Sequence, residues 1–214
     1  RDYTRCENLN GRRVTLIFLF YFYYIMVKAY WGGQLLGGYA GIHHTAEKIS
    51  KYIPKCKTYV EPFAGLGRLH QYINAENIYY NDMSDFAFNY LKESYPDAIV
   101  TQQDFTEMFK HDSEDTFFLI DPVWRSEHYS KNSLTFMDRK PYEYYKKIFE
   151  IVPKLKGNWI ICGVADERQT RGYMSNHNYN KLIVESEGNV IFGKKARTLL
   201  VSNVDLNNGV VDSC

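Results

Sequence analysis

Four short segments of this 214-residue chain each place acidic, glycine or aromatic residues directly after an apolar run. They are Glu61–Gly67 (EPFAGLG), Asn81–Asp82 (ND), Gln103–Phe105 (QDF) and Asp121–Trp124 (DPVW). In open α/β sheets, ligands bind beyond the carboxyl ends of the strands. If the apolar runs are parallel strands of one sheet, these segments lie at the same edge and can be parts of one site.

The segment that contains Asp121, Pro122 and Trp124 follows the most apolar run, and its residue types suit chemistry on the amino group of adenine. Such an amine is a weak nucleophile because its lone pair is delocalised into the ring. An Asp carboxylate and the carbonyl of the next residue can accept its two hydrogens, and an aromatic ring can stack on an extruded base. Acceptors placed in this way stabilise a transition state for methyl transfer. Asp-Pro after a strand is also a common turn, so the segment alone leaves both interpretations open.

The glycine-rich turn between Glu61 and Gly67 is suited to close approach of a ligand. Glycines at a strand-to-helix turn permit positive φ, and a helix expected from about Arg68 would favour an anion such as the carboxylate of a methionine moiety. His70 replaces the third glycine of a GxGxxG pattern, and no Gly-Lys-Ser/Thr follows, so the dinucleotide and phosphate-loop motifs are both excluded. A tight turn without a ligand is the alternative.

Two further acidic residues follow expected strands. Asp82 comes fifteen residues after Gly67, where a carboxylate can accept hydrogen bonds from ribose hydroxyls. It could instead cap a helix that begins near Ser84. Asp104 could bind an exocyclic amine while Phe105 covers an adenine ring, although a capped turn would have the same sequence.

The remaining chain predicts the elements that position these segments. Short apolar runs alternate with segments of helical period, which is typical of βαβ units. Strands are expected at 58–63, 77–80, 98–101, 116–120, 158–164, 181–185 and 196–203, the last two as an antiparallel pair. Helices are expected at 44–52, from about 68, at 84–94 and at 142–155. The predicted fold class is α/β, with a Rossmann-like, doubly wound sheet.

Composition limits the partners and the compartment. The net charge of +1 excludes a global basic field, so any contact with nucleic acid must come from a local patch. The four cysteines are far apart and form no CxxC pair, so neither a zinc site nor a disulfide framework is expected. We therefore expect a reducing compartment, the cytoplasm. The apolar run at 14–27 is too short to span a bilayer as a helix.

Taken together, these segments resemble the Dam-like DNA adenine-N6 methyltransferases, a family with an EPFAGxG cofactor motif and a DPPY catalytic motif. EPFAGLG is a close match to the first motif, and NDMSD at 81–85 is similar to the family's ribose-binding segment. YAGIH at 39–43 lies where the family has a Trp-Ala-Gly-Gly-Lys box, and ARTLLVSN at 196–203 is similar to its final strand. The resemblance covers Trp31 to Val204. It implies a seven-stranded methyltransferase sheet, S-adenosylmethionine as cofactor and adenine in DNA as acceptor.

The resemblance also implies a role for each matched residue. Asp121, Pro122 and Trp124 would hold the target base. The cofactor pocket would be lined by Tyr39, His43, Glu61, Pro62, Phe63, Ala64, Gly65, Gly67, Asp82, Asp104, Phe105 and Asp121.

Three departures from the family pattern stand out. Val123 replaces the second proline of DPPY, so the backbone loses the rigidity that a following proline imposes. His43 stands where the family has Lys, so a fixed positive charge becomes pH-dependent. The interval between the glycine turn and Asp121 is too short for the target-recognition domain that some members insert there. We expect a non-native or disordered leader at 1–29, with the functional protein beginning near Met26, a catalytic domain without a separate recognition domain at 30–205, and a tail at 206–214.

Contacts with nucleic acid are expected from two basic segments. The loop at 125–140 interleaves basic and aromatic residues, as single-strand binding requires, and a second basic cluster lies at 194–197. The expected contact residues are Arg125, Lys131, Arg139, Lys140, Lys194 and Lys195. A solvated loop and a charged hairpin tip are the alternatives.

The leading hypothesis is a site-specific DNA methyltransferase that transfers a methyl group from S-adenosylmethionine to adenine N6. One alternative keeps the chemistry and changes the acceptor to RNA, cytosine N4 or a small molecule. Another is a catalytically degenerate relative that only binds nucleic acid. Neither a metal nor a membrane partner is expected, and the pattern does not predict an oligomeric state.

Overall fold

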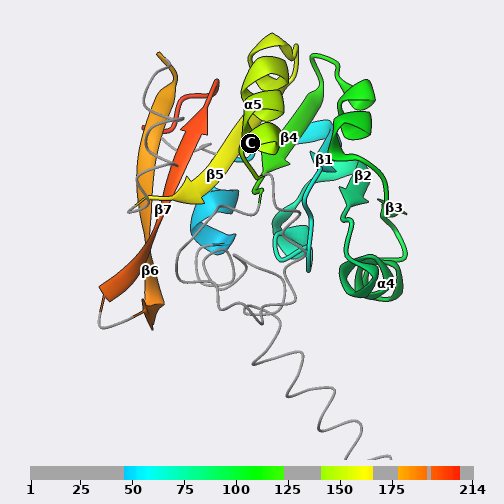
Figure 1. Cartoon of the computed structure of the whole chain (residues 1–214), viewed down its shortest axis with the longest axis horizontal. Helices are drawn as coiled ribbons and strands as arrows, with labels where there is room; N and C mark the ends of the chain where they lie inside the picture. Colours follow the sequence, from blue (N-terminus) through cyan, green and yellow to red (C-terminus); the bar gives the residue numbers. More distant parts are fainter. Residues whose placement is uncertain (1–45, 123–140, 166–177, 192–193, 208–214) are drawn as a thin grey trace, which may run out of the picture.

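The computed structural model describes residues 46–122, 141–165, 178–191 and 194–207. Within these residues, seven strands form one sheet in the order β3-β2-β1-β4-β5-β7-β6 (Figure 1). The first five are parallel, and β7 pairs antiparallel with both β5 and β6. The bounds are β1 Cys56–Glu61, β2 Ala75–Asn81, β3 Ile99–Thr101, β4 Thr116–Ile120, β5 Asn158–Val164, β6 Asn180–Ile191 and β7 Lys194–Ser202. The predicted Rossmann-like sheet with a terminal antiparallel pair is confirmed.

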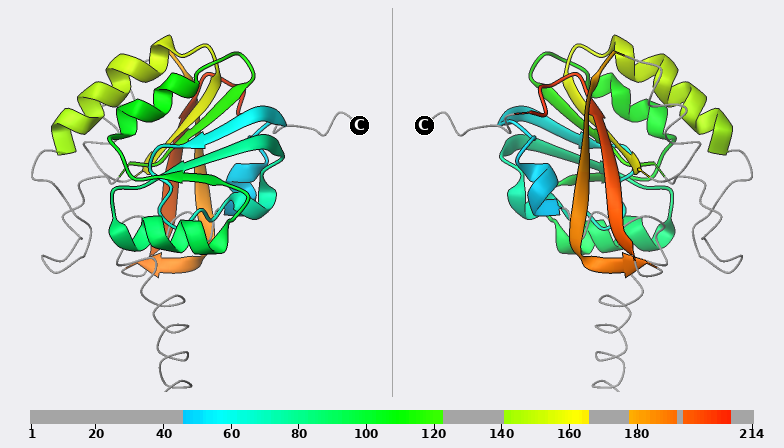
Figure 2. Two further views of the ribbon diagram at one scale, coloured as in Figure 1. Left: turned by 90° about the vertical axis from the view of Figure 1, so that its right-hand side faces the viewer. Right: turned by 90° about the vertical axis from the view of Figure 1, so that its left-hand side faces the viewer.

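Helical segments cover both faces of this sheet (Figure 2). Residues 46–50 are helical, and the other segments are η2 His70–Tyr72, α4 Asp85–Ser94, η3 Phe105–His111, α5 Pro141–Ile151 and η4 Val152–Lys154, where η marks a 3-10 helix. The segments η3 and α5 lie on one face, and the helix at 46–50 lies with α4 on the other. In the described part of the chain, no helix has both the length and the apolar character needed to cross a membrane.

The strands divide the hydrophobic core between the two faces because successive side chains of a strand point in opposite directions. In β4, Phe117 and Leu119 belong to the cluster under residues 46–50 and α4, whereas Phe118 and Ile120 pack with η3 and α5. All of β4 is buried, as is typical of a central parallel strand covered on both faces. The core therefore continues up to the carboxyl edge, where Asp121 follows.

Two of the predicted helices are wrong in extent. After the glycine turn, only the single 3-10 turn η2 forms, because β2 begins at Ala75 and leaves no length for several helical turns. The helix N terminus that was expected to favour an anion is therefore absent from this turn. The helix expected at 142–155 ends at Ile151 and continues only as η4, which contains Pro153. Proline lacks the backbone N–H that the helix would need there.

Gly157 provides a test of how closely two loops pack beneath the amino ends of the strands. A Cβ at this position would lie 2.5 Å from the carbonyl oxygen of Thr116 and 2.8 Å from that of Ser113. Both are backbone atoms, so neither can rotate away. We expect Gly157→Ala to lower the free energy of unfolding by about 1–3 kcal/mol, the usual effect of overpacking. Urea denaturation measures this loss.

The exposed neighbour Lys156 supplies the control for that experiment. Lys156→Ala should change the free energy of unfolding by less than about 0.5 kcal/mol. If both variants lost the same free energy of unfolding, the close contact of a Cβ at Gly157 with the two carbonyl oxygens would not be the cause of the loss.

Candidate active site

The four polar segments do meet at one edge of the sheet. The ends of β1, β2 and β3 are in parallel register, with Glu61 beside Tyr80 and Asn81 beside Thr101. Asp121 follows β4, and β4 pairs with β1 on the side of β1 that faces away from β2. The carboxyl ends of four neighbouring strands therefore bring together residues that are far apart in the sequence (Figure 1).

The turn after β1 depends on its two glycines. Gly65 has φ 47° and Gly67 has φ 56°, both in the left-handed region that disfavours side chains. A Cβ at Gly67 would also lie 2.7 Å from the ring of Tyr95. The turn is held against β2 because the Ala64 N–H donates to the carbonyl oxygen of Asn81 at 2.8 Å. The positive φ angles expected at these glycines are therefore present, and the approach of a ligand to this backbone stays a prediction.

Asp82 holds the glycine turn to the start of α4. Its two oxygens accept hydrogen bonds from the N–H groups of Gly65 and Ser84, each at 2.9 Å. Burial raises the pKa of Asp82, and these two hydrogen bonds oppose the rise. The helix cap itself is Ser84, whose hydroxyl accepts from the N–H of Ala87, so the capping alternative for Asp82 is wrong. Each carboxylate oxygen can accept more than one hydrogen bond.

Asn81 belongs to one of the four polar segments, but the sequence analysis assigned it no role of its own. Its buried side-chain amide donates to the carbonyl oxygens of Pro62 at 3.1 Å and Gln103 at 3.0 Å. Its side-chain oxygen accepts from the Gln103 N–H and the Thr101 hydroxyl, both at 2.9 Å. One side chain therefore connects the turn after β1 with the end of β3. In the sequence, its only signals were its place at the end of an expected strand and within the NDMSD segment, and neither indicates this joining role.

Asp104 and Phe105 lie at the start of η3. Asp104 caps this helix by accepting hydrogen bonds from the Thr106 N–H at 2.9 Å and the Thr106 hydroxyl at 2.5 Å. Partial burial raises the pKa of Asp104, but these hydrogen bonds and the charge of Lys147 outweigh it and lower the pKa. Phe105 is buried in the core, with its ring centroid 4.9 Å from that of Phe63. The capped turn that the sequence allowed is present, and the adenine contacts of Asp104 and Phe105 stay predictions.

Glu61 is the most unusual residue of the site because it is an acid with only 5% of its surface exposed. The Tyr59 hydroxyl donates to its Oε1 at 2.6 Å, whereas among the described residues its Oε2 has no hydrogen-bond partner. Burial raises the pKa of Glu61 to about 8, against the effect of the Tyr59 hydrogen bond and with a contribution from the charge of Asp121. An orphaned carboxylate oxygen at this depth requires a donor from a ligand or another group.

Asp121 is the second acid of the site whose pKa is raised. Burial raises the pKa of its carboxyl to about 8, and the following Pro122 is buried. The charges of Asp121 and Glu61 both help to raise the pKa of the buried Cys162 thiol on β5, although burial is the main cause. The ends of β1 and β4 thus place two carboxyls in one poorly solvated cluster. Acidic side chains with strongly raised pKa values are typical of functional sites.

Several predicted site residues lie outside the part that the structure describes. They are Tyr39, His43, Val123, Trp124, Arg125, Lys131, Arg139 and Lys140. Lys194 and Lys195 begin β7, but their side chains are not among those described. Pro62 and Ala64 are buried, and Phe63 is partly buried. Among the described residues, no group of three or more His, Cys, Asp or Glu side chains could hold a metal ion.

Comparisons with known proteins identify the family and the fold of this chain. The family model of D12 class N6 adenine-specific DNA methyltransferases matches residues 43–190, more than half of the chain. The fold is similar to that of an rRNA methylase from Streptococcus thermophilus, with a TM-score of 0.51 and 11% identity over 76% of this chain and 95% of that one. It is also similar to a precorrin-6y C5,15-methyltransferase from Geobacter metallireducens, with a TM-score of 0.50 and 9% identity over 75% and 86% of the two chains. No curated protein matches the sequence significantly.

Asn81→Asp tests whether the amide donors hold the edge together. The change is isosteric, but it turns a carboxylate toward the carbonyl oxygens of Pro62 and Gln103. We expect the free energy of unfolding at pH 7.5 to fall by about 1–3 kcal/mol, the cost of unmade buried hydrogen bonds. The loss should be smaller near pH 4, where the introduced carboxyl is protonated and can donate one bond. Urea denaturation at both pH values measures it, and the exposed Asn74→Asp is the control.

Glu61 should make stability depend on pH. Below its ordinary pKa of 4.5, the Glu61 carboxyl is protonated in both the folded and the unfolded state, so it does not make the free energy of unfolding depend on pH. Above this value, only the unfolded state ionises until the pH approaches about 8, so stability falls by up to about 1.4 kcal/mol per pH unit. Glu61→Gln, which can still accept from Tyr59, should therefore be more stable than the wild type at pH 7.5 and similar to it near pH 4.

Urea denaturation across pH 4 to 8 measures this difference. Glu76→Gln is the matched control, because Glu76 lies exposed on the neighbouring strand β2 and should follow the wild type at every pH. A stability gain in Glu61→Gln that stays constant over the range would show that the Glu61 carboxyl is already ionised in the folded protein.

Proposed function

Since this chain belongs to the family of D12 class N6 adenine-specific DNA methyltransferases, we propose that it transfers the methyl group of S-adenosylmethionine to the N6 amino group of adenine in DNA. The observation that carries the proposal is the juxtaposition of Glu61, the glycine turn and Asp121 at the carboxyl ends of β1 and β4. Cofactor-facing and acceptor-facing groups are thereby neighbours, which methyl transfer between two bound molecules requires.

Family membership confirms two of the sequence predictions. The chain is a methyltransferase, and S-adenosylmethionine is its cofactor. The residues present fit this cofactor, because the left-handed turn has no side chain at Gly65 or Gly67 that would block a ligand. In addition, Oε2 of Glu61 has no hydrogen-bond partner within the described ranges and can accept from a cationic group. When bound, the cofactor supplies a methyl group activated by a sulfonium centre.

On the cofactor side, each residue has a distinct part in the proposal. The Oε2 atom of Glu61 accepts from the ammonium group of the methionine moiety, since opposite charges attract strongly where water is excluded. The oxygens of Asp82 already bind two backbone N–H groups, and their remaining lone pairs accept from the ribose hydroxyls. Because Asp82 also accepts a hydrogen bond from the Gly65 N–H, one carboxylate positions both the ribose contacts and the backbone of the glycine turn.

On the acceptor side, the Asp121 carboxylate and the Pro122 carbonyl accept the two hydrogens of the adenine amine, and Trp124 stacks on the base. This requires the ionised form of Asp121. Burial raises the pKa of Asp121 to about 8, and a bound cation nearby favours ionisation. A loaded cofactor site would therefore prepare Asp121 as an acceptor.

Contacts with the phosphate backbone are proposed for the basic residues of the segments at 125–140 and 194–197. They are Arg125, Lys131, Arg139, Lys140, Lys194 and Lys195. The support is the interleaving of basic and aromatic residues in the sequence, which suits single-stranded or locally opened DNA. A cytoplasmic location is part of the proposal, and its support is the sequence, in which the four cysteines lie far apart and form no CxxC pair.

The proposal is tested by transfer of a labelled methyl group from S-adenosylmethionine to plasmid DNA, single-stranded DNA and RNA. Mass spectrometry of the products then identifies the modified base, and we expect N6-methyladenine in DNA. Methylated RNA or N4-methylcytosine would change the acceptor and keep the chemistry. No transfer by folded protein that binds the cofactor would favour the degenerate, nucleic-acid-binding alternative.

Asp121→Ala should reduce kcat for DNA methylation by about 100- to 1000-fold, the usual effect of removing one transition-state hydrogen-bonding group. The Kd for S-adenosylmethionine should stay within a few-fold of the wild type. Asp115→Ala is the matched control, because Asp115 lies exposed at the opposite end of β4 and should leave both constants unchanged. Full activity of Asp121→Ala would remove Asp121 from the mechanism.

A further inference from the structure

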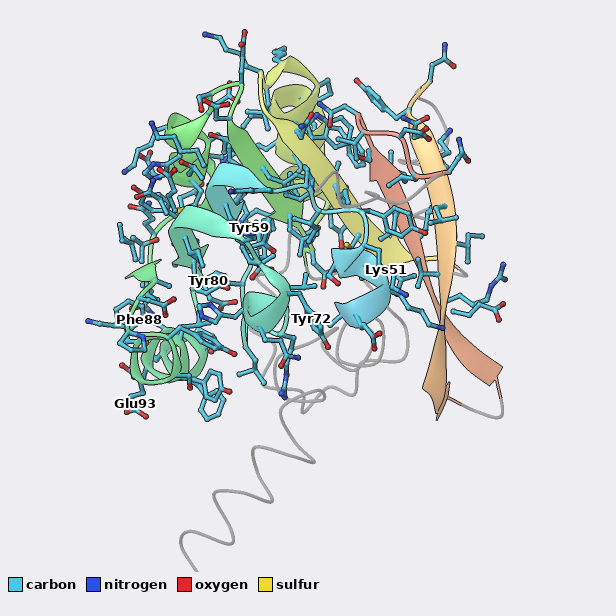
Figure 3. All side chains as sticks on the ribbon, turned by 180° about the vertical axis from the view of Figure 1, so that it is seen from behind. Lys51, Tyr59, Tyr72, Tyr80, Phe88 and Glu93 are labelled. Atoms are coloured by element: carbon cyan, nitrogen blue, oxygen red, sulfur yellow. The ribbon has the colours of Figure 1, made fainter. Side chains whose placement is uncertain are left out.

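Tyr59 lies within β1, two residues before Glu61, so both side chains point to the same face of the sheet. It is fully buried. Its ring stacks on Phe117 at a centroid distance of 6.2 Å and meets the edge of Tyr80 at 6.4 Å. Figure 3 shows Tyr59 and Tyr80 next to each other on β1 and β2. Phenylalanine would fill this space equally well, so the packing does not explain the hydroxyl of Tyr59.

The hydroxyl of Tyr59 has a defined partner. It donates to Oε1 of Glu61 at 2.6 Å, a short bond between two buried groups. This bond fixes the rotation of the Glu61 carboxyl and occupies one of its oxygens. The other oxygen, Oε2, is buried and has no partner among the described residues. Leaving a buried polar atom unpaired is costly, so a hydrogen-bond partner for Oε2 is missing from the described residues.

The surroundings of Glu61 specify the charge of that partner. The charge of Arg68, which follows the glycine turn, acts on Tyr95 but not directly on Glu61. The groups in the described residues that do interact with Glu61 come from neighbouring elements and are neutral or negative. They are Tyr59 on β1, Tyr80 on β2, Tyr95 after α4, Asp121 after β4 and Cys162 on β5. A negative carboxylate among these groups attracts a positively charged ligand group.

We propose that Tyr59 is a positioning residue for the cofactor: its hydroxyl holds Oε1 of Glu61 so that Oε2 receives the ammonium group of S-adenosylmethionine. This inference rests on the proposed function, because it presupposes the cofactor contact of Glu61. Tyr59 itself touches no ligand and acts only through the carboxyl that it holds.

The hydrogen bond also affects the ionisation of Glu61. Burial raises the pKa of this carboxyl to about 8, and the Tyr59 hydrogen bond lowers it because the hydroxyl stabilises the charged form. Removing the hydroxyl should therefore raise the pKa further. The ammonium group binds the ionised carboxyl, so affinity should fall as the pH decreases below this pKa, and the fall should begin at a higher pH in Tyr59→Phe.

The test compares two ligands by isothermal titration calorimetry on the full chain. S-adenosylmethionine carries the ammonium group, and 5′-methylthioadenosine lacks the whole amino-acid end. A hydrogen bond to a charged group corresponds to roughly a tenfold effect or more. We expect Tyr59→Phe to raise the Kd for S-adenosylmethionine by about tenfold at pH 7.5, with less than about a twofold change for 5′-methylthioadenosine.

Tyr80→Phe is the matched control. Tyr80 is equally buried on the next strand, but its hydroxyl lies 3.0 Å from Nδ1 of His70 and has no hydrogen bond to Glu61. This variant should change the Kd of either ligand by less than about twofold. Glu61→Gln provides a second, independent variant: it should show the same ligand-selective loss and little remaining pH dependence.

The outcomes distinguish the inference from the proposed function. Equal losses for the two ligands, or equal losses in Tyr59→Phe and Tyr80→Phe, would overturn the role of Tyr59 while leaving cofactor binding intact. Unchanged pH dependence in Tyr59→Phe would overturn it as well. Failure of the folded wild type to bind S-adenosylmethionine would overturn the inference together with the proposed function.

Discussion

The arrangement of this edge of the sheet depends on one buried side-chain amide, that of Asn81. It connects the turn after β1 with the loop after β3 through four hydrogen bonds to Pro62, Thr101 and Gln103. Such bonds contribute modestly when made and cost more when broken in the interior. Because both loops are hydrogen-bonded to the same amide, the positions of the glycine turn, Asp82 and the start of η3 are fixed relative to one another.

The hydrophobic core reaches this edge, and that determines its electrostatics. Strand β4 is fully buried, so the carboxyls beside its end lose their hydration, and burial raises the pKa of Glu61 and Asp121 to about 8. Two such acids lower the stability of the empty protein near neutral pH. A cation bound between them would offset that loss. In the proposed mode of binding, the same two groups therefore affect both stability and ligand affinity.

The fold of this chain is more widely shared than its family. The sheet is shared with an rRNA methylase at 11% identity and a precorrin-6y methyltransferase at 9% identity, and a shared fold does not imply a shared substrate. The family match over residues 43–190 is what indicates adenine in DNA. The residues that could distinguish acceptors must therefore be sought in the site and not in the sheet.

The parts that sequence alone determined are local. The apolar run of β4, the left-handed glycines Gly65 and Gly67, and the acid after β2 all follow from residue types and short spacings. The strand order agrees with the family resemblance. These features were predictable because the φ range that glycine permits and the apolar run typical of a central parallel strand can be read from a few neighbouring residues.

Tertiary structure decided the rest. The short η2 in place of a helix depends on where β2 begins, and the joining role of Asn81 depends on partners about twenty residues away. The pairing of Tyr59 with the buried Glu61, and the electrostatic contact of Glu61 with the partly buried Asp121, require neighbouring strands and covering helices. No local pattern carries this information, because burial, desolvation and hydrogen-bond partners are set by segments that meet only after the chain has folded.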